Sequence, residues 1–307
     1  MKRKNDYSLL PFIREDIYGL SPNIAQIIGW EINLFNIKNQ WQYSKGENTK
    51  IAVIDTGCDL DHPDLKNNII QGINILDPKK DPYDDNGHGT HVSGSISAED
   101  NGLGMVGVAP KSKILPIKAL DADGNGNNKY IAKGILFAAD QKCDFITMSL
   151  GSQVNSPDIY KAIKYATEKG CIIFCAAGNY GENSPIMYPA KYSETIAIGS
   201  IDRNLNRSNF TCKGDELDFL SPGQDILSCV PDNNYAIMSG TSMANPFAVG
   251  CASLLLSYAK LQNKQHLLKS SQDYIEIFKS GSKSLEQQQF KGKKEYEGYG
   301  ILYPRVI

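Results

Sequence analysis

Short apolar runs and stretches with helical spacing alternate along most of this 307-residue chain. The runs have the length of strands and lack a polar face, which is typical of strands buried on both sides of a parallel sheet. They stand at residues 50–55, 114–120, 144–150, 171–176 and 195–199. Helical patterns at 131–141 and 157–169 lie between them. The alternation predicts an α/β fold of three layers, α/β/α, with a mostly parallel central sheet.

Residues 243–261 form the longest apolar stretch, and its apolar side chains would occupy nearly every side of a helix. Such a helix is predicted to be deeply buried. Residues 262–295 are rich in Gln, Lys and Ser, which predicts a surface helix with a mobile loop. We expect residues 21–307 to form one domain and residues 1–20 to be an N-terminal extension.

The charge and hydropathy of the chain exclude two classes of partner. The formal net charge is −2 and the lysines are scattered, so neither nucleic acid nor an anionic membrane is expected to bind. No run approaches the ~20 apolar residues of a transmembrane helix. Met-Lys-Arg-Lys could open a signal peptide, but Pro11 and Arg14 interrupt the short apolar stretch that follows. We therefore expect no export signal.

The seven cysteines are odd in number and show no Cys-x-x-Cys spacing of the zinc type. Several stand in apolar runs, which favours buried, reduced thiols over a disulfide framework. Together with the missing export signal, this pattern predicts a cytoplasmic protein. An exported, disulfide-linked protein is the alternative, and a count of free thiols under denaturing conditions would distinguish the two.

Two polar residues stand beside the predicted secondary structure in positions suited to function. Asp55 ends the first buried run, where α/β proteins collect functional side chains, although a helix cap or a turn also uses Asp. His88 opens a predicted helix in Asn-Gly-His-Gly-Thr-His at 86–91. With His91 it could form a metal pair, but no Glu follows at the spacing of the known zinc helices. His91 is interpreted as a core histidine.

Ser242 and Asn179 are candidates of the same kind. Ser242 begins the buried helix, where free backbone N–H groups and the helix dipole favour an anion, although an N-cap is the common use of Ser there. Asn179 follows the run at 171–176, where a turn is the common use of Asn. The order Asp, His, Ser differs from the triads of α/β-hydrolases and of chymotrypsin, and it is the order found in subtilisin.

Four short motifs carry a resemblance to a known family. They are Asp-Thr-Gly at 55–57, His-Gly-Thr-His-Val at 88–92, Ala-Ala-Gly-Asn at 176–179 and Gly-Thr-Ser-Met-Ala at 240–244. Together they resemble the subtilisin-like serine proteases, the subtilases, from about residue 21 to residue 300. Asp-Thr-Gly-Cys-Asp at 55–59 and the missing export signal are most similar to the intracellular subtilisins. The resemblance implies a subtilisin-like catalytic domain over residues 21–307.

The activity implied by the resemblance is that of a serine endopeptidase of broad specificity, acting on polypeptides through an acyl-enzyme. Ser242 would attack the scissile carbonyl, His88 would accept and later return the proton, and Asp55 would orient His88 and stabilise its charged form. The side-chain amide of Asn179 and the N–H of Ser242 would bind the oxyanion.

The resemblance also suggests how a peptide substrate would bind. Two edge segments would pair with its backbone, a mode that tolerates many sequences. They consist of Gly124, Asn125 and Gly126, and of Ser149, Leu150 and Gly151. Ala176, Ala177 and Gly178 would line the pocket for the side chain before the cut and leave room for a large apolar group. Tyr180 replaces a residue that is often polar or acidic, and we expect it to weaken selection for Lys or Arg in that pocket.

Calcium is the cofactor that the resemblance implies, in a structural role. Asp-Ala-Asp-Gly-Asn-Gly at 121–126 starts like an EF-hand loop, but Ala132 stands where the loop needs Glu, so this interpretation is rejected. The family site would instead use the side chains of Asp64 and Asn101, although both residue types are also common in turns. Carbonyl oxygens would complete the shell, and they belong to Glu99, Leu103 and Met105.

The N-terminal extension is predicted to inhibit the domain. Leu9, Leu10, Pro11 and Phe12 are similar to the Leu-Ile-Pro-Tyr/Phe motif in the inhibitory extension of intracellular subtilisins. Proline lacks a backbone donor and has a restricted φ, so such a segment could occupy the cleft without being cut. A simple apolar anchor is the alternative. The resemblance thus implies a zymogen whose own extension is a partner, and it is compatible with a homodimer.

Two residues after Ser242 depart from the family pattern. Asn245 replaces a small residue and Phe247 replaces a usual His, and we expect both to serve packing. An inactive subtilase fold used as a binding module is one alternative for the whole chain. A metal- or nucleotide-binding α/β protein is another, but no dinucleotide fingerprint or P-loop is present.

Overall fold

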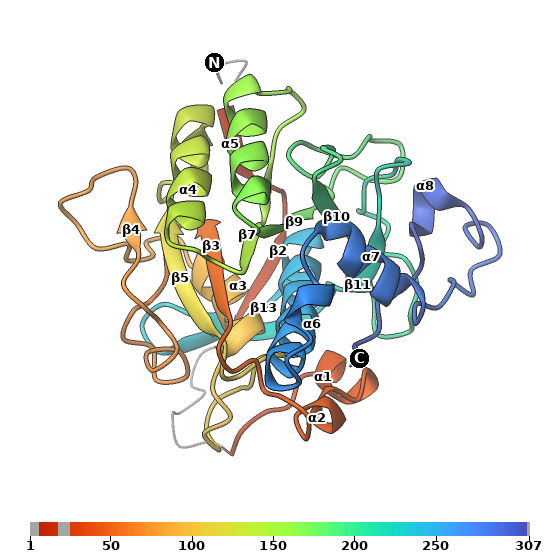
Figure 1. The fold of residues 1–307 in the computed structure, drawn as a ribbon, viewed down its shortest axis with the longest axis horizontal. Coiled ribbons are helices and arrows are strands. Elements are labelled where there is room, and N and C mark those ends of the chain that lie inside the picture. Colours follow the sequence, from red (N-terminus) through yellow and green to blue (C-terminus); the bar gives the residue numbers. More distant parts are fainter. Residues whose placement is uncertain (1–5, 18–24, 306–307) are drawn as a thin grey trace.

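The computed structural model describes residues 6–17 and 25–305, so the predicted boundary between residues 20 and 21 lies outside the described residues. Its centre is a seven-stranded sheet in the order β11-β10-β9-β7-β3-β5-β4, in which every neighbouring pair is parallel (Figure 1). The strands are β3 (Lys50–Asp55), β4 (Ile73–Asn74), β5 (Lys113–Lys118), β7 (Phe145–Met148), β9 (Ile172–Ala176), β10 (Thr195–Ile201) and β11 (Phe219–Pro222). Each of the five predicted runs overlaps one of these strands.

Two pairs of helices complete the three layers. One pair is α4 (Asn128–Asp140) with α5 (Pro157–Glu168), and the other is α3 (His88–Ser97) with α6 (Thr241–Leu261) (Figure 1). A glycine lets α4 approach the sheet, because a Cβ on Gly134 would lie 3.1 Å from Ile117 and 3.3 Å from Ile54. The α/β/α fold predicted from the alternation of runs is confirmed.

Helix α6 is buried along its length, as its apolar sequence predicts. Apart from Tyr258, Lys260 and Leu261, all of its residues are buried. Residues 262–295 form a short 3₁₀ helix at Gln265–Leu267 and then α7 (Ser271–Lys279), whose Tyr274 and Phe278 are buried. Among the described residues, no helix combines the length and apolar character needed to cross a membrane. All seven cysteines are buried.

The order of the central strands marks the place of a functional site. After β3 the chain builds β5 on one side of it, and later returns to build β7 on the other side. In open parallel sheets, ligands bind beyond the carboxyl ends of the strands where the order reverses in this way. Asp55, the last residue of β3, stands at this point.

Two small sheets flank the central one, and the N-terminal segment contributes a strand to each. Strand β1 (Asp6–Leu9) lies between β6 (Asn125–Asn127) and β8 (Leu150–Gly151). Strand β2 (Ile13–Ile17) pairs with β13 (Asn234–Ser239), which pairs in turn with β12 (Ile226–Val230). The remaining helices are α1 (Trp30–Leu34), α2 (Ile37–Gln40) and α8 (Lys294–Glu297). None of these small strands stands out as an apolar run in the sequence.

Candidate active site

The four candidate residues come from four different elements that meet at the carboxyl edge of the central sheet. Asp55 ends β3, His88 is the first residue of α3, Ser242 is the second residue of α6, and Asn179 follows β9. The side chains of Asp55, His88 and Ser242 are fully buried. Because these elements are distant in sequence, only the fold brings the four residues together.

Asp55 and His88 form a direct hydrogen bond. The distance from His88 Nδ1 to Asp55 Oδ1 is 2.8 Å, and the N–H of Thr56 donates to the same oxygen at 2.8 Å. Since the carboxylate accepts, Nδ1 carries the proton and Nε2 of neutral His88 has a free lone pair. Nε2 is buried and has no hydrogen-bond partner among the described residues. It can therefore act as a base.

Asp84, which the sequence analysis missed, holds the start of α3 in place. Its carboxylate accepts from Thr56 Oγ1 at 2.8 Å, from Gly87 N at 2.9 Å, and from the N–H and hydroxyl of Thr90 at 2.9 and 2.6 Å. Gly89 permits the close approach of α3 to β3, since a Cβ there would lie 2.2 Å from a backbone oxygen of Gly57. These contacts place His88 beside Asp55.

Ser242 does not form a hydrogen bond with His88 in this structure. Its Oγ donates instead to the carbonyl of Ser149 at 3.3 Å, and the Ser149 hydroxyl donates back to the Ser242 carbonyl at 3.0 Å. The ring of Phe12 packs against His88 with the ring centroids 5.1 Å apart. A rotation of the Ser242 side chain is needed to direct its hydroxyl to His88 Nε2.

Asn179 holds a peptide carbonyl at the start of α6. Its Oδ1 accepts from the N–H and the hydroxyl of Thr241 at 2.8 and 2.7 Å, which fixes the orientation of the amide. Its Nδ2 donates to the carbonyl of Pro11 at 2.7 Å. The N–H of Ser242 lies in the first turn of α6, where backbone donors have no partner within the helix. The site therefore offers two donors for a developing negative charge.

The N-terminal segment runs between the two predicted edge segments. Strand β1 pairs antiparallel with both, so that Tyr7 lies opposite Gly126 and Ser8 lies opposite Asn125 and Gly151. Farther along, Leu9 lies opposite Leu150, and its N–H donates to the carbonyl of Gly124 at 2.9 Å. Of the six predicted edge residues, only Ser149 lies outside this pairing, because its carbonyl and hydroxyl contact Ser242.

Leu10 is the buried side chain that follows β1, and it lies beside Gly151 and Met187. A Cβ on Gly151 would be 2.7 Å from Leu10 and 3.2 Å from Met187, and a Cβ on Gly178 would be 2.6 Å from Met187. Met187, which the sequence analysis missed, thus lies against Gly178 of the predicted pocket and Gly151 of the predicted edge segment. No local pattern marks Met187, since it lies in a loop that only the fold brings to the pocket.

The other residues predicted near this pocket differ in their exposure. Ala176 and Ala177 are fully buried at the end of β9. Tyr180 keeps 47% of its surface exposed, and its backbone is held by Cys212 and Ser184. The two departures from the family pattern lie in the core. Asn245 donates to Thr147 at 2.8 Å, and Phe247 packs edge-on against Phe35.

The predicted calcium ligands gather around one side chain. Gln26 Nε2 donates to the carbonyl of Glu99 at 2.7 Å and to those of Leu103 and Met105 at 3.4 Å each. Asp64 lies in the same loop region, where Asn101 Nδ2 donates to its Oδ1 at 3.2 Å and Met105 N donates to its Oδ2 at 2.9 Å. Three carbonyl oxygens therefore converge on a point that Gln26 now satisfies.

Gln26 is a further residue that the sequence analysis missed. Backbone bonds place it, since its own N–H donates to Gly102 and the N–H of Ile27 donates to Gly104. Rotating its amide by half a turn would direct an oxygen toward the three carbonyls. If the amide of Asn101 turned as well, these four oxygens and one each from Asp64 and Asn101 would make six, which fits the 6–8 oxygen ligands that Ca²⁺ prefers. No sequence signal links Gln26 to a loop about 75 residues away.

His91 has the geometry of a structural histidine. Its Nε2 lies 3.1 Å from the carbonyl oxygens of both Ile226 and Ala236, so this nitrogen is the donor. Burial lowers the pKa of His91 to about 3, with a further contribution from His88. His91 therefore stays neutral and ties α3 to β12 and β13. It is not placed to act as a second base.

Comparison with known proteins gives a consistent result. The Subtilase family model matches residues 46–300. An intracellular serine protease of Paenibacillus polymyxa is 40% identical over 275 residues, which cover 87% of this chain and 82% of the relative. The major intracellular serine protease of Bacillus subtilis (strain 168) is 42% identical, with 76% of each chain covered. Thermitase of Thermoactinomyces vulgaris is also 42% identical, over 72% of this chain and 79% of its own.

Proposed function

Because this chain belongs to the subtilase family and is a subtilisin-type serine endopeptidase, we propose that Asp55, His88 and Ser242 are its catalytic triad. One observation carries the proposal. A segment of the chain itself runs through the cleft as an extended peptide, with a carbonyl hydrogen-bonded to Asn179 at the start of the Ser242 helix. Polypeptides are the substrates, and backbone pairing with β6 and β8 supports broad specificity.

The proposed reaction begins when the Ser242 hydroxyl turns from Ser149 toward His88. His88 Nε2 removes the proton as Oγ attacks the scissile carbonyl, and Asp55 stabilises the imidazolium that forms. The carbonyl oxygen becomes an oxyanion held by Asn179 Nδ2 and the N–H of Ser242. His88 then protonates the leaving amine, and the acyl-enzyme on Ser242 remains. Water, deprotonated by His88, hydrolyses this ester and regenerates the enzyme.

Replacing Asn179 with Ala should lower kcat by about 10²–10³-fold and change KM much less. This range is the one known for the oxyanion donor of subtilisin, a member of the same family. The physical reason is that Nδ2 contributes most when the oxygen carries full charge. Steady-state kinetics on a peptide substrate measure the effect, with the exposed Asn39→Ala on α2 as the control. A loss below about tenfold would show that another donor binds the oxyanion.

We also propose that residues 1–20 hold the enzyme as a zymogen, and the contacts of residues 10–12 support this. The buried Leu10 side chain fills the space beside Gly151 and Met187. The carbonyl on Asn179, however, belongs to Pro11, one residue later. In a productive substrate, one residue must supply both the pocket side chain and the attacked carbonyl. In the extension, Leu10 supplies the pocket side chain and Pro11 supplies the carbonyl on Asn179. Because two different residues take these places, the extension fills the cleft in a form that Ser242 does not cut.

The triad and the zymogen can be tested with one reagent. A fluorophosphonate probe should label the wild type and not Ser242→Ala. It should label a chain lacking residues 1–20 about 100-fold faster or more, since an occluded site reacts only in proportion to its open population. Leu10→Asp in the full chain should also speed labelling, because a charge is costly in an apolar pocket. Equal rates for all three would contradict the zymogen, and no labelling of any folded form would favour a binding module.

We propose that Ca²⁺ is bound where Gln26 meets the loop after α3, with Asp64 supplying the negative charge. The ligands would be the side chains of Gln26, Asp64 and Asn101 and the carbonyls of Glu99, Leu103 and Met105. The support is the convergence of three carbonyls on one position, which a cation would satisfy better than an amide N–H. The ion would tie the segment before α1 to the loop after α3.

Removing calcium should lower the melting temperature by about 5–10 °C. Saturation at ~100 times Kd contributes about 2.7 kcal/mol, and each kcal/mol shifts a domain of this size by about 2–4 °C. Thermal denaturation with and without a chelator measures the shift. Gln26→Ala should reduce it, whereas Gln272→Ala on the surface of α7 should not. A wild type that is insensitive to chelation would exclude the site.

Location and assembly are further parts of the proposal. Two relatives are named as intracellular serine proteases, which supports a cytoplasmic location. A homodimer stays a prediction that sedimentation of the purified chain can test.

A further inference from the structure

The strand that follows Pro11 indicates where substrate residues after the cleaved bond would lie. Strand β2 runs antiparallel to β13 over five residue pairs, from Ile13 opposite Ser239 to Ile17 opposite Tyr235. The pairing begins two residues after the carbonyl that Asn179 holds, and Ser239 lies three residues before Ser242. If the proposed function is correct, a substrate counted from that carbonyl would follow the same path along β13. The inference below rests on that function.

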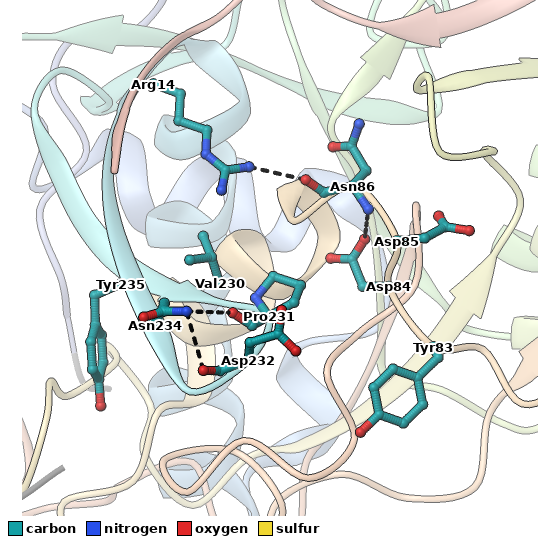
Figure 2. A pocket seen from close by; sticks show the side chains of 10 residues that line it. All are labelled: Arg14, Tyr83, Asp84, Asp85, Asn86, Val230, Pro231, Asp232, Asn234 and Tyr235. Carbon is teal, nitrogen blue, oxygen red and sulfur yellow. Dashed lines mark hydrogen bonds between the residues drawn. The ribbon is translucent and has the colours of Figure 1, made fainter. Parts of the chain in front are cut away.

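Arg14, the third residue after this carbonyl, stands at the edge of a pocket of about 350 Å³. Figure 2 shows its side chain pointing toward Asn86. Asp84 and Asp85 lie next to Asn86, and Asp232 lies across the pocket, next to Pro231. The guanidinium donates from Nη1 to the carbonyl of Asn86 at 3.0 Å. The pocket thus joins the loop before α3 to the turn between β12 and β13.

A glycine makes room for this guanidinium. A Cβ on Gly87 would lie 2.8 Å from Arg14 Nη1 and 3.3 Å from Pro231, so a larger residue at position 87 would displace the arginine. Gly87 also has a φ of 103°, a conformation that glycine adopts without strain. Arg14 lies opposite Met238 in the β-pairing, and Met238 is buried. Arg14 itself is exposed, and its guanidinium lies against Gly87 at the start of α3.

The pocket carries more negative than positive charge. Asp84 accepts five hydrogen bonds from the surrounding loop and helps to shape the pocket. Asp85 forms an ion pair with Lys118 and remains half exposed. Asp232 is exposed and forms no ion pair among the described residues. Three carboxylates line the pocket, and Lys118, which lies outside its lining, pairs with only one of them, so the pocket favours a positively charged side chain.

We propose that this pocket is a specificity subsite that selects Arg or Lys as the third residue after the cleaved bond of a protein substrate. Arg14 of the extension occupies the position that this substrate side chain would take. Asn86 supplies a carbonyl acceptor at the wall, and Asp232 and Asp85 supply charge that a flexible cationic side chain can approach through the open volume. Arg should be preferred over Lys, because its planar fork offers several donors at once.

The competing interpretation is that Arg14 only anchors the extension and that the pocket plays no part with substrates. Both interpretations predict that changes in Arg14 affect the zymogen. They differ in what they predict for substrates that lack any part of the extension. The deciding experiment therefore varies the substrate and leaves the extension unchanged.

The test uses internally quenched peptides that are identical except for Arg, Ala or Glu at the third residue after the cleavage site, which mass spectrometry locates. The enzyme is the full-length chain, incubated until its peptidase activity is constant. We expect kcat/KM to be about fivefold to tenfold higher for Arg than for Ala, and lower for Glu than for Ala. The ratio of kcat/KM for the Arg peptide to that for the Ala peptide should fall toward one at ~1 M salt, since the Debye length there is about 3 Å.

A pair of variants assigns the preference to the pocket. Asp232→Asn should reduce the Arg-to-Ala ratio by at least about half, whereas Asp158→Asn, the same change on α5, should leave the ratio unaltered. A wild-type ratio near one, or a ratio that Asp232→Asn does not change, would overturn the subsite while the peptidase stands. If no peptide is cleaved even by the Leu10→Asp chain, whose extension should no longer block the cleft, the proposed function fails, and the subsite fails with it.

Discussion

Replacing Ser242 with Ala should lower kcat by about 10⁶-fold, the loss known for the nucleophile of subtilisin, a member of the same family. The change removes the hydroxyl that we propose attacks the scissile carbonyl. The neighbouring hydroxyl of Ser149 cannot substitute for it, because it donates to the Ser242 carbonyl. The variant should still fold, since the only hydrogen bond lost among the described residues is the 3.3 Å contact with Ser149. Hydrolysis of a peptide substrate, followed over hours, measures the residual rate.

Two controls make this result decisive. Ser193→Ala, at an exposed position, should keep full activity. The thermal denaturation of Ser242→Ala should match that of the wild type, which would separate lost chemistry from lost structure. Residual activity above about one thousandth of the wild type would mean that another group acts as nucleophile. The surviving rate should still exceed that of water, because the oxyanion donors and the substrate contacts remain.

Replacing Asp55 with Asn should lower kcat by about 10⁴-fold while leaving the fold intact. Asp55 Oδ1 now accepts from His88 Nδ1 at 2.8 Å and so keeps the lone pair on Nε2. An amide has one acceptor and two donors, and the Thr56 N–H competes for that acceptor. An N–H directed at His88 would move the imidazole proton to Nε2, where it prevents attack by Ser242. The neutral amide also cannot stabilise the imidazolium.

The measurement is kcat on the same peptide, together with the rate of fluorophosphonate labelling. Both should fall, because each depends on the removal of a proton from Ser242. The exposed Asp158→Asn serves as the control for the loss of one negative charge. A loss below about 100-fold would indicate that His88 is oriented by something other than Asp55, and the proposed triad would need revision.

The layers of this protein follow from local sequence patterns. Apolar runs without a polar face must be covered on both sides, and only a sheet between two layers of helices does this. The apolar surface of α6 leads to burial for the same reason. The triad candidates were also identifiable, because Asp55, His88 and Ser242 stand in short motifs beside predicted strands and helices. Apolar runs and short motifs depend on neighbouring residues only, so they can be identified from the sequence alone.

Contacts between distant segments were not predictable in this way. Neither β1 nor β2 is a conspicuous apolar run, and they are strands because β6, β8 and β13 offer free backbone groups along their edges. Gln26 reaches the carbonyls after α3, and Met187 reaches Gly151, through the course of loops. Arg14 reads in the sequence as a charge that ends an apolar stretch, and only the pairing of β2 with β13 brings it to the edge of a pocket.

The sequence by itself thus determined the class of fold, the buried elements and the candidates for the catalytic residues. The tertiary structure alone decided which backbone lies in the cleft, which carbonyl faces Asn179, and which side chains surround the loop of Glu99. The physical reason is that burial and turn formation depend on neighbouring residues, whereas edge pairing and convergent oxygens depend on where the completed sheet places segments far apart in the chain.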